Sequence, residues 1–279
     1  MRIALIQQHV GTDREDNLTG ALVAMGEARR QGADICAFAE LAIDRFFPAE
    51  RGCSWAAGVA ERIPGPSADV IAARARDLNL VTVFNQYEKA EDGRMFDSSP
   101  VFDSDGALLG VTRMIHITDY DMFHEQEYYA PGDHGAPVYD TSAGRIGVAI
   151  CYDRHYPEYM RALGVAGAEL VIIPQAGTVG EWPSGMYEAE VCTAAFQNGY
   201  FVALCNRVGI EGELTFAGDS FVSDTEGRVL VRGPSGEDAI IMCDVDLAEC
   251  ANSTARRLFW RDRRPDLYGS WLGDSSQGR

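Results

Sequence analysis

The sequence predicts an α/β protein in which two β-sheets pack on each other between outer layers of helices. Strand-like apolar runs alternate with helix-like amphipathic segments along most of the 279 residues, a pattern typical of sheets covered by helices. Two more strand pairs, joined by Asp-Ser-Asp-Gly and Asp-Thr-Glu-Gly turns, are typical of β-hairpins. Because strands outnumber helices, the helices can cover only the outer faces of two stacked sheets.

In the N-terminal half, a strand is followed by a helix twice before the first hairpin. Gly32 is expected to end the first helix, and Ser67 to cap the second. The expected elements are strands at 2–9, 33–39 and 81–87, helices at 13–31 and 67–79, and a hairpin formed by 95–102 and 107–113.

The C-terminal half continues the pattern and ends in a tail. The expected elements are strands at 145–150, 170–174, 201–207, 219–223, 229–232 and 239–244, and helices at 156–165 and 184–198. No low-complexity linker separates two parts, so residues 1–279 are expected to form one domain. Residues 245–279 form a tail that is basic and aromatic over 256–273. We expect this tail to dock on a partner subunit, the alternative being a solvated irregular segment.

Composition excludes several classes of partner. A net charge of −18 and a pI near 4.6 argue against binding to nucleic acid or to an anionic membrane. From the first residues, MRIALIQQH, we expect neither a signal peptide nor a spanning segment. Seven cysteines without a CxxC pair suit a reducing compartment, so we expect a cytoplasmic protein.

The stretch from Arg145 to Glu158 predicts a nucleophile. A buried strand ends at Cys151, a polar turn follows, and Pro157 begins a helix. A strand, turn and helix in this order can expose a side chain at the carboxyl edge of a sheet, where a thiol is well placed to attack a substrate. The alternative is that Cys151 is a buried, inert side chain, as cysteines commonly are.

A carboxylate follows another buried strand. Glu40 comes directly after the apolar ICAFA segment, at the edge where α/β sheets place their sites. A functional role is favoured over that of a surface charge.

Residues 112–132 gather further polar groups. The candidate ligands are His116, Asp119, Asp121, His124, Glu125 and Glu127. Their spacing is neither that of an HExxH motif nor that of an EF-hand, so we expect no metal and no cofactor. A metallohydrolase remains the alternative. The preferred interpretation is that one of these carboxylates joins Cys151 and Glu40.

Five segments of the chain carry a resemblance to a known family. They are RIALIQ, AFAEL, HEQEYYAPGD, GRIGVAICYDRHYPE and DRRPDLYG, which together span nearly the whole chain. On these motifs the chain is identified as a member of the nitrilase superfamily of carbon–nitrogen hydrolases, and it resembles the carbamoylase, β-ureidopropionase and aliphatic amidase-like branches. The resemblance implies a four-layer αββα sandwich whose subunits pair, with C-terminal tails crossing the dimer. We therefore expect a homodimer or a larger homo-oligomer.

The resemblance also implies a Glu-Lys-Cys triad supported by a second Glu. The general base falls on Glu40, the nucleophile on Cys151 and the supporting carboxylate on Glu125. The family's lysine is missing, because Met114 occupies its place. Lys89, the single lysine of the chain, lies on another strand.

A cation is expected to replace that lysine. Arg113 and His116 are the candidates, provided that either turns inward. The backbone N–H of Tyr152 is expected to donate to the oxyanion.

Arg154 and His155 resemble the RH pair of β-ureidopropionases, where a carboxylate is bound. Arg154 is equally consistent with a pair to an acid of its own chain. The expected activity is hydrolysis of N-carbamoyl amino acids or small amides through a thioester-type intermediate on the cysteine. The alternatives are a nitrilase acting on nitriles and a catalytically silent binding protein.

Overall fold

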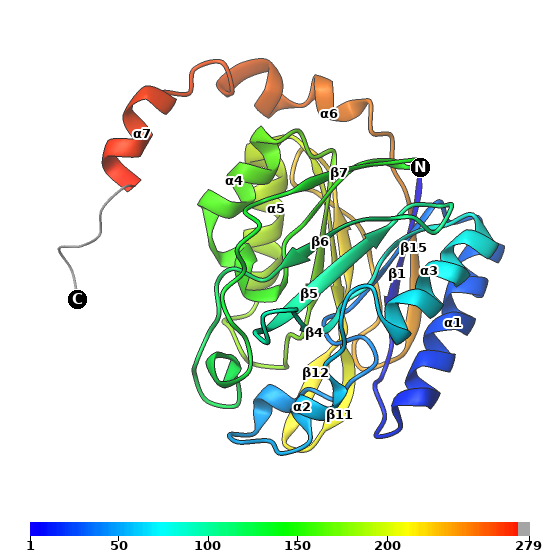
Figure 1. Cartoon of the computed structure of the whole chain (residues 1–279). Helices are drawn as coiled ribbons and strands as arrows, with labels where there is room; N and C mark the ends of the chain where they lie inside the picture. The colour runs from blue at the N-terminus through cyan, green and yellow to red at the C-terminus, as the bar shows by residue number, and fades with distance from the viewer. Residues whose placement is uncertain (273–279) are drawn as a thin grey trace.

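Two β-sheets form the centre of the protein. In the computed structural model, which describes residues 1–272, both sheets are mixed parallel and antiparallel (Figure 1). The first has the order β15-β1-β2-β3-β5-β4, with β6 beside β5; the second has the order β14-β13-β10-β9-β8-β7. The first contains β1 (Arg2–Gln7), β2 (Ile35–Phe38), β3 (Val81–Val83), β4 (Gln86–Lys89), β5 (Met95–Phe102), β6 (Leu108–Arg113) and β15 (Ala239–Asp244). The second contains β7 (Val138–Thr141), β8 (Gly144–Val148), β9 (Leu170–Gln175), β10 (Phe201–Asn206), β13 (Phe221–Ser223) and β14 (Val229–Arg232).

Helices cover the outer face of each sheet. α1 (Arg14–Arg30) and α3 (Pro66–Leu78) lie on the first sheet, whereas α4 (Pro157–Val165) and α5 (Met186–Asn198) lie on the second (Figure 1). Three apolar cores fill the spaces between these layers, and the largest is between the two sheets. The predicted four-layer αββα sandwich is confirmed.

Local sequence explains where the first helices begin and end. The Asp13 side chain caps α1 by accepting hydrogen bonds from two backbone N–H groups, and Gly32 follows the helix at a φ of +89°. The expected cap at Ser67 is wrong. Gly65 holds the capping position and Pro66 begins α3, while the Ser67 N–H and hydroxyl bond to Glu61.

Most predicted strands are present, with three differences. The expected strand at 81–87 is two strands, β3 and β4, because the chain crosses over to pair with the far side of β5. A small hairpin of β11 (Val208–Glu211) and β12 (Leu214–Ala217), and strand β7, were not predicted. The remaining short elements are η1 (Phe47–Ala49), α2 (Ala56–Val59), η2 (Glu125–Glu127), η3 (Cys151–His155), α6 (Glu249–Asn252) and η4 (Ala255–Phe259).

The C-terminal segment leaves the sandwich. The Trp260 indole N–H donates to Gln197 O (3.2 Å), so this part of the tail packs on the outer helices. α7 (Pro265–Leu272) then lies apart from the sheets (Figure 1). The predicted tail spans 245–279, and its residues 273–279 lie outside the described part. No helix within residues 1–272 is both long and apolar enough to cross a membrane.

Candidate active site

Cys151 lies on the turn that the sequence predicted. Strand β8 ends at Val148, η3 begins at Cys151, and α4 follows from Pro157. Cys151 has a φ of +43°, a conformation that costs free energy for a residue with a Cβ and that is concentrated at functional sites. Its side chain is buried but 5% of the residue remains exposed. The turn therefore presents the thiol at the carboxyl end of β8.

Glu40 faces Cys151 from the other sheet. It follows β2, and the next residue, Leu41, has a φ of +47°. Two side chains hold this turn: fully buried Arg207 donates to Glu40 O (2.8 Å) and Leu41 O (2.6 Å), and Asn85 Oδ1 accepts from Leu41 N (2.6 Å). The backbone that carries the carboxylate is thus fixed from two sides.

Glu125 completes the group. It begins η2, is fully buried, and its Oε2 accepts from Thr118 N (3.4 Å). One ligand-type atom of each of Glu40, Glu125 and Cys151 lies within 4.8 Å of the others. The structure therefore brings together the three residues that the sequence assigned to catalysis.

The electrostatics of this cluster favour uncharged side chains. Burial and the nearby Glu125 charge raise the pKa of Glu40 to about 8. Burial also raises the pKa values of Glu125 and Cys151 well above their ordinary range, and the two glutamates raise that of the thiol further. The Glu40 carboxyl group is therefore ionised, and able to accept a proton, mainly at alkaline pH.

Met114 stands where the lysine was expected, and Arg113 does not replace it. Met114 is fully buried in the core between the sheets. Arg113, the neighbouring residue on the strand, points to the opposite face, because side chains alternate along β-strands. Its guanidinium donates to Glu88 Oε1 (2.5 Å) and to Asp133 Oδ1 (3.0 Å). The expectation that Arg113 turns inward is wrong.

His116 does not supply a cation either. Its Nδ1 lies 2.7 Å from Asp153 Oδ1, and its ring stacks on Tyr156 at a centroid distance of 3.5 Å. This ring holds the turn after Cys151 rather than the carboxylates. Among the described residues, no arginine, lysine or histidine donates a hydrogen bond to the carboxylate of Glu40 or Glu125.

Arg154 and His155 share an acid of their own chain. Arg154 is buried; its Nε lies 3.4 Å from Glu190 Oε2, and His155 Nδ1 lies 2.6 Å from Glu190 Oε1. Arg154 Nη1 also donates to Cys151 O (2.8 Å) and to Gln175 Oε1 (2.9 Å). The observed arrangement is the internal pair and not an open carboxylate site.

The polar cluster at 112–132 is dispersed in the fold. Arg51 bonds to Asp119 and Glu127, and His124 bonds to Asp119, while Glu125 alone reaches the thiol. Within residues 1–272, the one group of three close metal-ligating side chains is Glu40, Glu125 and Cys151. The metallohydrolase interpretation based on residues 116–127 is therefore wrong.

Two functional candidates were missed. Gln175 ends β9, and its Nε2 donates to Cys151 Sγ (3.2 Å); Arg154 orients this amide by occupying its oxygen. Gln175 could have been found because β9 is parallel to β8 and ends at the same sheet edge. Asp97 is fully buried in the middle of β5 beside Glu40, and an acid within a buried strand is itself a signal.

The loop before α5 lies near the thiol, because the Glu181 charge contributes to the raised pKa of Cys151. Glu181 accepts hydrogen bonds from the hydroxyl groups of Tyr120 (2.5 Å) and Tyr187, and from Thr178 N (3.0 Å). This carboxylate joins the loop before α5 to the loop that carries Glu125. Trp182, the next residue, packs against Tyr120 at a ring distance of 6.0 Å.

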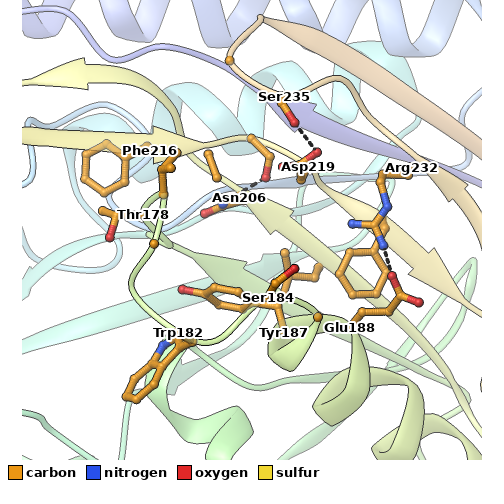
Figure 2. A pocket seen from close by; sticks show the side chains of 18 of the residues that line it. Thr178, Trp182, Ser184, Tyr187, Glu188, Asn206, Phe216, Asp219, Arg232 and Ser235 are labelled. Carbon is orange, nitrogen blue, oxygen red and sulfur yellow. Dashed lines mark hydrogen bonds and ion pairs between the residues drawn. The ribbon is translucent and has the colours of Figure 1, made fainter.

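A cavity of about 840 Å³ borders this loop. Thr178, Trp182 and Tyr187 line the cavity, whereas Glu40, Glu125 and Cys151 do not, so this loop separates it from the thiol cluster or connects the two. Figure 2 shows Trp182 at one end of the view and the ion pair of Arg232 with Glu188 at the other. The cavity has the size of a small-molecule site and contains one guanidinium group.

Comparison with known proteins identifies the family. The chain belongs to the carbon–nitrogen hydrolase family, whose profile matches residues 2–254. It is 29% identical to omega-amidase NIT2 of Homo sapiens over 273 residues, which cover 96% of each chain. It is 32% identical to N-carbamoylputrescine amidase of Solanum lycopersicum over 209 residues, which cover 70% of this chain and 69% of the relative.

Solved structures show the same fold. A carbon–nitrogen hydrolase from Helicobacter pylori superposes with a TM-score of 0.87 at 26% identity, covering 98% of both chains. A mutant of the Nesterenkonia amidase from the nitrilase superfamily superposes with a TM-score of 0.79 at 25% identity, covering 98% of this chain and 97% of that one. The protein is therefore a carbon–nitrogen hydrolase of the amidase type.

Proposed function

We propose that the protein hydrolyses the C–N bond of small amides or N-carbamoyl amino acids, with Cys151 as the nucleophile. The observation that carries the proposal is the convergence of Glu40 and Glu125 on one thiol, which a turn with a positive φ presents at a sheet edge. A purely structural core has no need of three buried ionisable groups in contact, because each costs free energy to bury.

The steps follow from these positions. Glu40 takes the thiol proton as the Cys151 sulfur attacks the carbonyl carbon. The C–N bond breaks, the leaving amine or ammonia receives the proton from Glu40, and a thioester remains. Glu40 then takes a proton from water, whose oxygen attacks the thioester, and the sulfur leaves and regains a proton. Glu125 holds the substrate nitrogen.

Backbone and side-chain donors stabilise the developing charges. The Tyr152 N–H lies in the first turn of η3, where amide groups lack an acceptor within the helix, and it is our candidate donor to the oxyanion. Gln175 Nε2 already donates to the sulfur, so it stabilises the thiolate that forms. Removal of one oxyanion donor typically costs on the order of 3 to 4 kcal/mol, so a site without the lysine depends on such groups.

Substrate class is proposed from the cavity. Arg154 is buried in its pair with Glu190, whereas Arg232, the guanidinium of the cavity, is half-exposed in its pair with Glu188 and can exchange that partner for a substrate carboxylate. The Arg232→Ala variant is expected to raise KM for N-carbamoyl amino acids about tenfold or more, because a charged hydrogen bond is lost, and to leave uncharged amides unaffected. If the KM for N-carbamoyl amino acids is as unaffected by the substitution as the KM for uncharged amides, Arg232 does not bind a substrate carboxylate, and the proposed substrates are uncharged amides alone.

Ammonia release from a panel of amides, N-carbamoyl amino acids and nitriles tests the function. Turnover is expected for the first two classes and is expected to disappear in Cys151→Ala. Turnover that survives this substitution would remove Cys151 from the mechanism. A folded protein that hydrolyses no compound of the panel would favour the alternative function, that of a catalytically silent binding protein.

A further inference from the structure

Asp97 lies directly beside the position that lacks the lysine. Strands β5 and β6 are antiparallel with Ser98 opposite Arg113, and the Met114 N–H donates to Asp97 O (2.9 Å). Asp97 and Met114 are therefore cross-strand neighbours. Because side chains alternate, both point to the face opposite to that of Arg113, which is the face of the catalytic cluster.

Several oxygens at this face lack a partner. Asp97 is fully buried, and its Oδ2 accepts no hydrogen bond. Both carboxylate oxygens of Glu40 are likewise buried and accept none. The side chains of Asp97 and Glu40 are in hydrogen-bonding contact when one proton lies between them. Two carboxylates in contact repel each other, whereas a carboxylic acid and a carboxylate form a strong hydrogen bond.

The other oxygen of Asp97 is fixed. Asn85 Nδ2 donates to Asp97 Oδ1 (2.6 Å), and Asn85 Oδ1 accepts from Leu41 N (2.6 Å). One amide thus ties the Asp97 carboxyl group to the backbone next to Glu40. This anchoring leaves Asp97 Oδ2 as the atom that can carry a proton toward Glu40.

We propose that Asp97 is a positioning residue for Glu40. In its protonated form it donates a hydrogen bond from Oδ2 to the Glu40 carboxylate and holds that base against the Cys151 thiol, a task for which this site has no cation. The proposal rests on the proposed role of Glu40 as the base.

The electrostatics of the pair agree with this assignment. Burial and the Glu40 charge raise the pKa of Asp97 well above its ordinary range, whereas the pKa of Glu40 is raised to about 8 and the hydrogen bond from Asp97 lowers it. In the proposed pair, Glu40 loses its proton first as pH rises and Asp97 keeps its own, because the Glu40 charge raises the pKa of Asp97. The reactive form has one proton on the pair, so reactivity rises as Glu40 ionises and falls again when Asp97 ionises.

The pH profile of Cys151 alkylation by iodoacetamide tests the pair without a substrate. In Asp97→Asn the amide still donates to Glu40 but cannot ionise, so the rise is expected to stay in place and the fall at high pH to disappear. In Asp97→Ala the hydrogen-bond donor to Glu40 is lost, so the rise in the alkylation rate is expected to move to higher pH. At pH values below this rise, the alkylation rate is expected to fall about tenfold or more. Rates come from peptide mapping, which separates Cys151 from the other six cysteines.

Asp224→Asn is the matched control. Asp224 is also buried, but it lies in the β13–β14 turn, where it accepts from the N–H groups of Glu226 and Arg228. The profile of this variant is expected to equal that of the wild type. Asn and Ala variants at 97 with the same profile as each other, or as the wild type, would overturn the proposal.

Infrared spectroscopy separates a failure of the pair from a failure of the proposed function. Above pH 8 the wild type is expected to show the C=O stretching band of a protonated carboxyl group that is absent in Asp97→Asn. This band requires no turnover, so it tests Asp97 even if no amide in the panel is hydrolysed. Identical bands in wild type and variant would overturn the proposal, whatever the activity.

Discussion

At the residue scale, the buried carboxyl groups of Glu40 and Glu125 receive no hydrogen bond from any cation among the described residues. Where the family's lysine was expected, Met114 offers neither a charge nor a donor, and the neighbouring Arg113 and His116 are bound to acids elsewhere. The thiol instead has Gln175 and buried carboxyl groups around it. In the account proposed above, a proton shared between carboxyl groups holds Glu40 against the thiol, a task that a cation would otherwise perform.

Restoring the cation should change this balance. In Met114→Lys the ammonium group lies beside Glu40 and favours its ionised form, so alkylation of Cys151 is expected to begin at a pH about one unit or more lower. Met114→Leu, which keeps the size and adds no charge, is the control and should follow the wild type. An unshifted profile in the lysine variant would show that position 114 does not face the base.

The sequence located the candidate catalytic residues better than their partners. Glu40, Cys151 and Glu125 each stand at the end of a recognisable segment, and the fold brings them together. The sequence could not show which way Arg113 points, because strand register decides which face of the sheet a residue takes. Its partner Glu88 lies on β4, which the sequence analysis did not separate from β3. Asp97 and Gln175 become visible only when the strands are placed side by side.

At the element scale, hydrogen bonds from buried arginine side chains to backbone carbonyl groups fix the two turns that carry Glu40 and Cys151. The turn after β2 depends on Arg207, whose charge is balanced by Glu211 and whose donors reach the carbonyl groups of residues 40 and 41. Turns with a positive φ at Leu41 and Cys151 persist only when the surrounding structure fixes them.

Loss of this arginine should therefore be costly. Arg207→Met leaves Glu211 buried without its cation and frees two carbonyl groups, so the free energy of unfolding in urea is expected to fall by about 3 to 5 kcal/mol. Arg232→Ala removes the exposed pair with Glu188 and is expected to cost at most about 1 kcal/mol. Equal losses in the two variants would contradict the role of Arg207 as a clamp.

At the scale of the whole molecule, the buried carboxyl groups of the candidate site make the free energy of unfolding depend on pH. The pKa of Glu40, at about 8, and the raised pKa values of Asp97 and Glu125 mean that the folded state holds more protons than the unfolded state. This contribution is fully present below the ordinary carboxyl range, near pH 4, and is lost as pH rises through the folded pKa values.

Stability is therefore expected to fall with rising pH. Between about pH 5 and pH 8 the free energy of unfolding should decrease by up to about 1.4 kcal/mol per pH unit for each such group. Glu40→Gln cannot ionise, so the slope measured by urea unfolding at a series of pH values should be smaller than in the wild type. The same slope in both proteins would mean that Glu40 does not hold a proton in the folded state.

Assembly is the other property of the whole molecule. We predict a homodimer or a larger homo-oligomer, because α7 lies apart from the sheets and offers a segment that a second copy can cover (Figure 1). Light scattering of the full chain should give at least twice the mass of the 30.5 kDa protomer, and a chain ending at residue 261 should give a smaller value. A monomeric full chain at micromolar concentration would contradict this prediction.

The most direct test of the central claim is the intact mass of the protein during incubation with amides and N-carbamoyl amino acids, measured together with ammonia release. We predict a transient acyl or carbamoyl adduct that maps to Cys151, is absent in Cys151→Ala, and persists longer in Glu40→Gln, which lacks the base for deacylation. Ammonia release without any adduct on Cys151, or an adduct that maps to another cysteine, would contradict the account.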